Sequence, residues 1–378
     1  MPDLAESLAE RWAIKTHWFT LKFGESIVVD YTGFHQNSES LSQVGKQDDQ
    51  WQAREVRLDV AGSIGSAYKV KYYVNASYNG FDATSDKRWN LVDLWLAFPL
   101  GCRDTTLTVG KTKETFDYEV VSSFVTLPQQ ERILNPFFTS RDVGLKLTQV
   151  LANKRMTLSG GVFSDWWVNG STPKNGGADA SARLTGLLWD DPDRGRYFHL
   201  GISGRYLSAA HDTLRYAGRP ESNVASDYVD TGNFPGDHAW HLGLEALWSQ
   251  GPISVLAEYN RAWTESPATR NPQFYGYYIL ASWVLTGESR PYNHATGYTG
   301  RLVPKYHWGA PELVARFSRV DLDDETVHGG RFYKTYLGAN WWMSGQWKLG
   351  FGWGHTWLNR FGGTGITDSF LTRVQWVF

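Results

Sequence analysis

The chain has 378 residues and a formal net charge of −2, so its composition gives no overall attraction to nucleic acid. A single cysteine, Cys102, excludes a disulfide framework and a zinc site made of several cysteines. No run of about 18 apolar residues occurs, which excludes a transmembrane helix but not a membrane β-barrel. Aromatic residues make up 15% of the chain, a content typical of the aromatic belts of such barrels.

The first 17 residues differ from the rest of the chain. Apolar residues recur at every fourth position from Leu4 to Trp12, which is consistent with a short helix over 4–15 and equally with a frayed leader. The start of the chain lacks the basic and apolar stretches of a signal peptide, so the chain is either cytosolic or a mature, exported form. The strands that follow favour export. We therefore expect a periplasmic segment over 1–17 and a barrel over 18–378.

From residue 18 onward the dominant period is two residues, as in half-buried strands. In the stretch 68–78, for example, Tyr72 and Val74 alternate with Lys71 and Asn75. Sixteen strands are predicted in this way. They are expected near 19–31, 54–60, 68–78, 91–100, 104–113, 141–151, 154–166, 180–190, 196–208, 238–250, 252–264, 274–287, 310–320, 333–343, 347–358 and 368–378.

The connections between these strands alternate in length. Short turns are expected at 65–66, 99–103, 152–153, 190–195, 250–251 and 344–346. Long polar loops are expected at 33–50, 80–90, 114–140, 167–179, 209–237, 265–273, 321–332 and 359–367. One connection, 288–309, is long where a short turn is due. Short turns at one end and long loops at the other are typical of outer-membrane barrels.

The last strand shows what its two faces meet. Phe370, Val374 and Trp376 share one face, whereas Arg373 and Gln375 share the other. We expect the first face to contact lipid and the second to face water, with this strand closing against the first strand so that no edge is left open. The predicted fold is an all-β, 16-stranded antiparallel transmembrane β-barrel in the bacterial outer membrane. A soluble β-sandwich would need neither an even number of strands nor the asymmetry of the loops.

Six stretches, in a characteristic order, carry a family resemblance. They are "REVRLDVAGSIG" (54–65), "TVGKTKETFDYEVVSS" (108–123), "SRDVGLKL" (140–147), "GRPES" (218–222), "GYYILASWVLTGESRPY" (276–292) and "LVARFSRVDL" (313–322). Together they resemble the phosphate-selective porin O and P family. This resemblance implies a homotrimeric channel whose third loop, here about 114–140, folds into the lumen as a constriction. It also implies that basic residues line the path of an anion.

The candidate pathway residues come from alternation and from the resemblance. An anion channel selects its solutes with arginine and lysine side chains, which offer charge and hydrogen-bond donors. Alternation also points Arg183 and Arg373 into the lumen, and the turn 288–309 adds a candidate basic cluster. For each candidate the alternative is a solvated charge without a selective role. The candidates are Arg57, Lys69, Lys71, Arg132, Arg141, Lys146, Arg205, Arg215 and Arg219.

Other lumen positions argue against tight phosphate binding. Where the family pattern has basic residues, this chain has Ser26, Glu55 and Val120. Inward carboxylates and aromatics such as Trp95 suggest a larger organic anion or a mixed field. We expect passive uptake of small anionic solutes, with a weakly selective general porin or a channel for organic acids as alternatives.

A barrel enzyme and an adhesion barrel are two other classes of protein with this type of fold. A barrel enzyme would need a Ser–His pair, yet no recognisable motif surrounds His199, His241 or His355, and "GISG" (201–204) lies inside a strand. An adhesion barrel with a plugged lumen would not conduct. No cofactor, metal or nucleic-acid motif is found. The expected partners are therefore small anionic solutes, outer-membrane lipid and two further copies of the chain.

Overall fold

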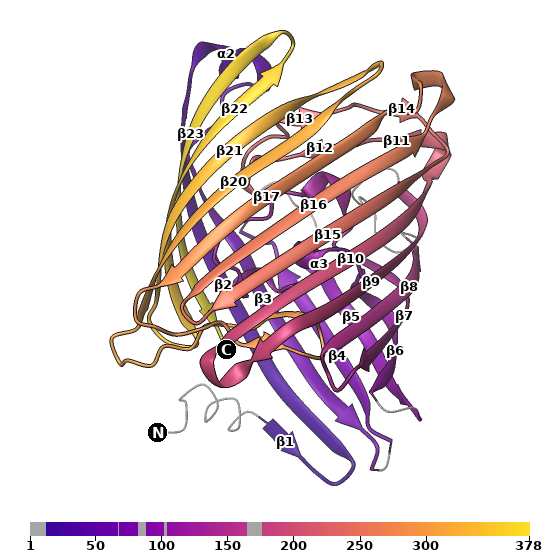
Figure 1. The fold of residues 1–378 in the computed structure, drawn as a ribbon, viewed down its shortest axis with the longest axis vertical. Helices are drawn as coiled ribbons and strands as arrows, with labels where there is room; N and C mark the ends of the chain where they lie inside the picture. The colour runs from indigo at the N-terminus through magenta and orange to yellow at the C-terminus, as the bar shows by residue number, and fades with distance from the viewer. Residues whose placement is uncertain (1–12, 67, 82–87, 102–103, 165–175) are drawn as a thin grey trace.

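The computed structural model describes residues 13–66, 68–81, 88–101, 104–164 and 176–378, which form a closed antiparallel β-barrel (Figure 1). Each wall strand pairs with its neighbours in chain order, and β23 closes the barrel against β2. The wall strands are β2 (Phe19–Gln36), β3 (Gln50–Ile64), β4 (Val70–Tyr78), β5 (Trp89–Leu100), β6 (Thr105–Lys113), β7 (Arg141–Leu151), β8 (Met156–Ser164), β9 (Gly176–Asp191), β10 (Arg196–Ala209), β15 (His238–Gln250), β16 (Ile253–Glu265), β17 (Gln273–Val284), β20 (Ala310–Asp324), β21 (Val327–Trp342), β22 (Trp347–Arg360) and β23 (Gly363–Val377). The predicted fold class and all sixteen predicted strand positions are confirmed.

The two faces of β23 differ as predicted. Phe370 and Val374 are 55% and 39% exposed on the outer surface, whereas Arg373 and Gln375 are 0% and 1% exposed in the interior. The outer face of the barrel is therefore apolar, and the inner face is polar, as a membrane barrel with a wet lumen requires.

Two of the long loops predicted from the sequence are instead strands. The predicted loop 321–332 is taken up by the ends of β20 and β21, and 359–367 is taken up by the ends of β22 and β23. Only short turns remain, and Phe361 and Gly362 form one of them with φ of 56° and 85°. Beyond the membrane both faces of a strand meet water, so the alternation of apolar residues that marks a strand is lost there.

The remaining elements are short. Of the helix expected over 4–15, residues 13–15 form the strand β1 (Ala13–Lys15), which pairs with β2, and the other residues lie outside the described part of the chain. Helix α2 (Ser38–Val44) occupies the first long loop. No helix in the described part of the chain is both long and apolar enough to cross a membrane. Single turns of 3-10 helix are η3 (Pro192–Arg194), η4 (Ala210–Asp212) and η5 (Pro267–Thr269).

Three connections fold into the barrel. The inserted loop 114–140 carries α3 (Tyr118–Val121), η1 (Phe124–Thr126) and η2 (Asn135–Phe137), and α3 lies inside the barrel (Figure 1). The outer loop 210–237 carries the two-residue strands β11 to β14 (Figure 1). The periplasmic turn 285–309 carries β18 and β19. The bounds of these short strands are β11 (Thr213–Leu214), β12 (Ala217–Gly218), β13 (Val229–Asp230), β14 (Phe234–Pro235), β18 (Tyr292–Asn293) and β19 (Tyr298–Thr299).

The inserted loop has an apolar core of its own. Five of its apolar side chains have no exposed surface, and they pack in one cluster with aromatic residues of the outer loop. These five are Phe116, Val120, Ile133, Leu134 and Phe137. Apolar burial therefore holds the loop compact, while polar contacts with the barrel wall decide where it sits.

At the seam of the barrel a buried ion pair joins β23 to β2. Arg373 of β23 donates from Nε and Nη2 to both carboxylate oxygens of Asp30 in β2, at 2.8 and 2.7 Å. Arg373→Met leaves a buried carboxylate without its counter-charge, which costs about 3–5 kcal/mol. We expect a clearly lower unfolding temperature, followed by circular dichroism in detergent micelles. Adding Asp30→Asn should restore part of the loss, and exposed Arg270→Met should change nothing. An unchanged transition in Arg373→Met would contradict this role.

Candidate functional site

The inner face of β20 to β23 binds the backbone of the inserted loop. Five buried side chains on these strands each donate a hydrogen bond to a different carbonyl oxygen within residues 125–131. The contacts are Gln375 to Val125 at 2.9 Å, Lys348 to Leu127 at 3.2 Å, Asn340 to Pro128 at 2.7 Å, Arg373 to Gln130 at 2.7 Å and Arg316 to Glu131 at 3.3 Å. This side of the lumen is therefore filled, and its basic residues are used to hold the loop.

Glu131 adds an ionic anchor to the same segment. Its carboxylate accepts from Arg54 of β3 at 2.6 Å and from Arg373 at 2.8 Å. Burial opposes ionisation, but the two arginines outweigh it and lower the pKa of Glu131 to about 2. The loop is thus tied to strands on both sides of the seam.

The outer loop is anchored through the Arg219-Pro220-Glu221 triplet. The Glu221 carboxylate is 1% exposed and lies 3.3 Å from Arg316 and 3.6 Å from Lys334. The Lys334 ammonium also donates to the Pro220 carbonyl at 2.6 Å. Arg219 itself points away from this anchor, and it lies 3.6 Å from Asp227 with a side chain that is 46% exposed.

The periplasmic turn 285–309 meets the inserted loop from the opposite end. The hydroxyl groups of Tyr118 and Thr299 are 2.7 Å apart, and Arg183 donates to the Gly297 carbonyl at 2.8 Å. The sequence left open whether the basic residues of this turn form a cluster that attracts anions or a plain charged turn, and four of them contact other groups of the protein. Their partners are Glu312 for Arg290, Asp190 for His294, the Gly345 and Val377 carbonyls for Arg301, and the Gly287 carbonyl for Lys305.

Beside the inserted loop the lumen contains a cavity of about 370 Å³, called the lumen cavity below. The wall strands from β3 to β9 supply one side of it, and the inserted loop and the periplasmic turn supply the other. The cavity is lined by Arg57, Tyr73, Asp93, Trp95, Thr112, Lys113, Glu114, Thr115, Val121, Ser123, Arg141, Lys146, Thr148, Ser159, Arg183, Ala295, Thr296 and Tyr298.

All three arginines that line the lumen cavity are paired with carboxylates, and Arg183 lies 2.6 Å from Glu245. Arg57 lies 2.8 Å from Glu55, and the Nε of Arg141 donates to Asp93 at 3.0 Å. The Nε of Arg57 is buried and has no hydrogen-bond partner among the described residues. Arg57 and Arg141 therefore each keep N–H groups that can donate to a further acceptor, although a carboxylate lies close to each guanidinium.

Two lysines of the lumen cavity bind only uncharged oxygens among the contacts found in the described chain. Lys146 donates to the Thr112 hydroxyl at 3.0 Å and to the Lys113 carbonyl at 3.1 Å. Lys113 donates to the carbonyls of Ser122 at 2.5 Å and Val121 at 3.3 Å. A buried ammonium without a carboxylate partner requires a counter-ion to remain charged. The cavity thus has room for a negative charge.

Aromatic rings flank these charges. The ring centroids of Tyr73 and Trp95 are 5.5 Å apart, with 35° between the ring planes. Asn75 donates to the Tyr73 hydroxyl at 3.1 Å, which fixes the orientation of that ring. Tyr298 of the periplasmic turn also lines the cavity. The cavity therefore offers flat apolar surface next to its cations.

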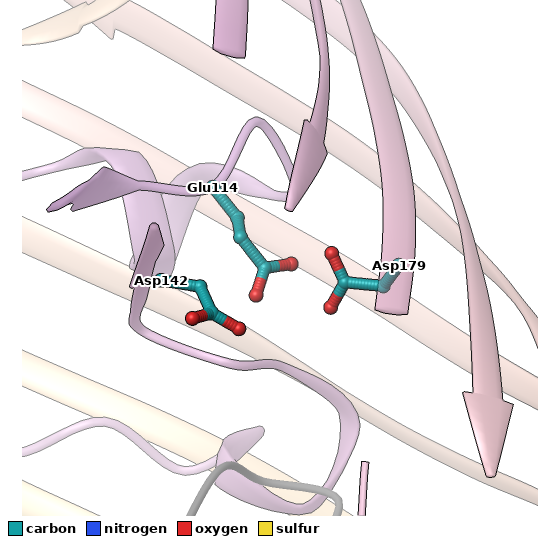
Figure 2. A group of neighbouring side chains, drawn as sticks. All are labelled: Glu114, Asp142 and Asp179. Carbon is teal, nitrogen blue, oxygen red and sulfur yellow. The ribbon is translucent and has the colours of Figure 1, made fainter. Parts of the chain in front are cut away.

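Three buried carboxylates, Glu114, Asp142 and Asp179, point toward one another beside this cavity (Figure 2). Among the described residues they are the one group that could hold a metal ion, with ligand oxygens within 4.8 Å of one another. Arg205 already lies 2.9 Å from Glu114 and 2.7 Å from Asp179. Burial raises the pKa of Glu114, and Arg205 opposes that shift. The group joins both ends of the inserted loop to β9 and β10.

The predicted pathway residues fall into three sets. Arg57, Arg141 and Lys146 line the lumen cavity. Two others are used for structure, because Arg205 is held between carboxylates and Arg132 donates to the Glu119 and Ser122 carbonyls. The rest lie elsewhere: Lys69 and Lys71 are exposed near the turn between β3 and β4, and Arg215 and Arg219 pair with Asp230 and Asp227 in the outer loop.

Lys113 is a basic residue of the cavity that the sequence did not reveal. It ends β6, where pairing with β5 has stopped at Leu94–Lys111 although pairing with β7 continues to Arg141. Thr112 and Lys113 both line the cavity, so the alternation of faces no longer gives the direction of Lys113 there. Of the family departures, the Ser26 hydroxyl donates to Glu55 at 2.7 Å, whereas Val120 is fully buried in the inserted loop. Position 120 therefore does not face the lumen cavity.

Comparisons with known proteins agree with this architecture. The model of the family described as phosphate-selective porin O and P matches residues 22–355. Porin O of Pseudomonas aeruginosa is 23% identical over 95% of this chain and 89% of its own length. An uncharacterized protein of Caulobacter vibrioides is 26% identical over 74% of this chain and 57% of its own length.

Solved structures show the same fold at low sequence identity. The outer membrane channel DcaP of Acinetobacter baumannii has a TM-score of 0.60 at 10% identity, covering 96% of this chain and 99% of that one. An anion-selective porin from Comamonas acidovorans has a TM-score of 0.60 at 9% identity, covering 95% and 100%. The trimer form of OmpT from Vibrio cholerae has a TM-score of 0.55 at 9% identity, covering 95% and 100%.

A closed barrel with an apolar outer face, a loop folded into its lumen and a polar cavity beside that loop defines a porin of the bacterial outer membrane. Since the family model covers most of its length, the chain belongs to the phosphate-selective porin O and P family. The named relatives are porins and channels, which fits a protein without enzymatic activity.

The Glu131 anchor predicts a pH dependence. The folded-state pKa lies below the ordinary value, so the stabilisation is complete above about pH 5 and is lost as the pH falls toward 2. The difference in unfolding free energy between the wild type and Glu131→Gln should be constant above about pH 5 and shrink by about 3 kcal/mol toward pH 2. Urea unfolding in detergent would measure this. Exposed Glu265→Gln should show no such narrowing, and a pH-independent difference for Glu131→Gln would contradict the anchor.

Proposed function

We propose that this porin admits small anionic solutes by passive diffusion through the lumen cavity. The observation that supports the proposal most strongly is the pair of lysines, Lys113 and Lys146, whose contacts within the described chain are to neutral oxygens. The paired arginines Arg57 and Arg141 add donors on the same wall. Several weak contacts of this kind favour passage over tight binding.

The relatives support the transport of anions in general but do not identify the solute. The family is described as phosphate-selective, and one solved neighbour is an anion-selective porin. In this chain the inserted loop and the periplasmic turn line one cavity together with the basic residues of β3 to β9. A solute that passes the constriction must therefore approach these cations.

A weakly selective general porin is the second candidate. Asp93 and Glu114 line the same cavity as the cations, so the field there is mixed in sign. If these carboxylates dominate, the ratio of chloride to potassium permeability would lie near one. Reversal potentials in a salt gradient distinguish the two candidates directly.

Neutralising the two lysines tests the proposal. In the double variant Lys113→Met/Lys146→Met the cavity loses both carboxylate-free cations, so we expect the chloride-to-potassium permeability ratio to fall several-fold toward one. Planar bilayer recordings of the purified porin would measure the reversal potential. As a matched control, Lys46→Gln/Arg270→Gln removes two exposed charges of the outer rim and should leave the ratio close to that of the wild type. Equal ratios in all three proteins would refute the proposal.

We also propose that the functional unit is a homotrimer. The outer surface over β9 to β17 is hollowed to about 870 Å³ and is lined by Leu184, Leu200, Ile202 and Leu244, with the small residues Gly186, Ala246 and Ala257 between them. A neighbouring barrel would fill this depression, and a solved neighbour of the same fold is described in a trimer form. Lipid chains are the other possible occupant of the depression.

A large side chain in the depression tests the oligomer. Ala257→Trp should block close approach of a second barrel and shift the protein from trimer to monomer, as measured by cross-linking and by mass in detergent. Ala339→Trp, on the outer face of β21, places the same ring on a strand that does not pair with β17 and should leave the trimer intact. A trimer that persists equally in both variants would place the interface elsewhere.

A further inference from the structure

We propose that the lumen cavity is a binding site for aromatic carboxylates, meaning planar organic monoanions with a ring. The inference rests on the proposed function and names the class of solute that this cavity would favour. It combines three features of one wall: lysines whose hydrogen bonds go to uncharged oxygens, arginines that are already paired, and a pair of aromatic rings beside them.

The charges suit a single negative charge better than a double one. Lys113 and Lys146 come from adjacent strands, β6 and β7, and neither has a carboxylate among its hydrogen-bond partners in the described chain. Glu55 and Asp93, however, lie within 2.8 and 3.0 Å of the two arginines. A multiply charged phosphate would meet these carboxylates at close range, and like charges at such distances are costly.

The arginines can still donate to a carboxylate. The Nε of Arg57 is buried without a hydrogen-bond partner among the described residues, whereas the Arg57 side chain as a whole is 20% exposed and lines the cavity together with Arg141. A carboxylate has two acceptor oxygens and is planar, so it can accept from a guanidinium and from a nearby ammonium at the same time. A solute with a single negative charge can make both contacts, provided that its carboxylate is correctly oriented.

The rings supply the second half of the site. Trp95 and Tyr73 contact one another in a tilted arrangement on the inner face of β5 and β4, and Tyr298 lines the cavity from the periplasmic turn. Aromatic rings prefer an aromatic partner over an aliphatic one of the same size, by an offset or edge-to-face arrangement. The cavity volume of about 370 Å³ falls in the range of small-molecule sites.

The test is block of the chloride current through the porin in a planar bilayer. Benzoate, cyclohexanecarboxylate and inorganic phosphate are added in turn, and the concentration for half-block is measured for each. Benzoate and cyclohexanecarboxylate carry the same charge on rings of similar size, so their ratio reports the aromatic contribution. We expect benzoate to block at a concentration about five-fold lower than cyclohexanecarboxylate, and below phosphate.

Variants of the ring pair locate the effect. Trp95→Leu should bring the ratio of the two carboxylates close to one, whereas Trp95→Phe should keep most of the preference for benzoate. Tyr73→Leu gives a second route if Trp95→Leu fails to fold. Trp283→Leu is the matched control, because Trp283 is 50% exposed on the outer surface and should not alter the ratio.

The outcomes separate this inference from the proposed function. An anion-selective porin in which phosphate blocks best, in which benzoate and cyclohexanecarboxylate block equally, or in which Trp95→Leu keeps the ratio, would overturn the aromatic site while leaving anion uptake in place. A wild-type porin without anion preference would instead overturn the proposed function. Anion preference together with a benzoate ratio that depends on Trp95 would support both.

Discussion

A chain segment placed inside a barrel has to find partners for its backbone, because buried peptide groups without hydrogen bonds are costly. The inserted loop meets this constraint only in part by forming short helices, and the carbonyls of residues 125–131 remain free for the wall. Buried side chains of β20 to β23 satisfy five of them. The rest of the lumen follows from this demand, because the donors that hold the loop are spent on it and are no longer available to a solute.

One side of the barrel wall therefore binds the inserted loop, and the other side lines the lumen cavity. On β20 to β23 the basic residues Arg316, Lys348 and Arg373 are structural, with exposures of 2%, 1% and 0%. On the opposite side, from β3 to β9, the loop leaves a cavity that is lined by basic residues. The periplasmic turn completes this division, because its contact between Thr299 and Tyr118 supports the loop from below. A count of lumen arginines and lysines would overstate the charge that a solute meets.

Strand alternation predicted the barrel because a membrane-spanning strand must show lipid one face and water the other. That rule made the strand 238–250 and the closing strand recognisable from the sequence, and it failed at 321–332 and 359–367, where no lipid covers the strands. Alternation also gave the inward direction of Arg205 and Lys146, but direction does not name a partner. Glu114 lies far from Arg205 in the sequence, and only the folded loop brings the two together. Lys113 was missed because it lies at the end of its strand, beyond the last pair with β5, where alternation no longer gives the direction of a side chain.

The seam residue Arg373 ties the closing of the barrel to the placing of the loop. It binds Asp30 in the first wall strand and Gln130 and Glu131 in the inserted loop. Its strand is the one that closes the barrel against β2, so the bond to Asp30 forms only when this seam is closed. An open seam would therefore leave Gln130 and Glu131 of the inserted loop without a fixed partner on the β23 side of the wall.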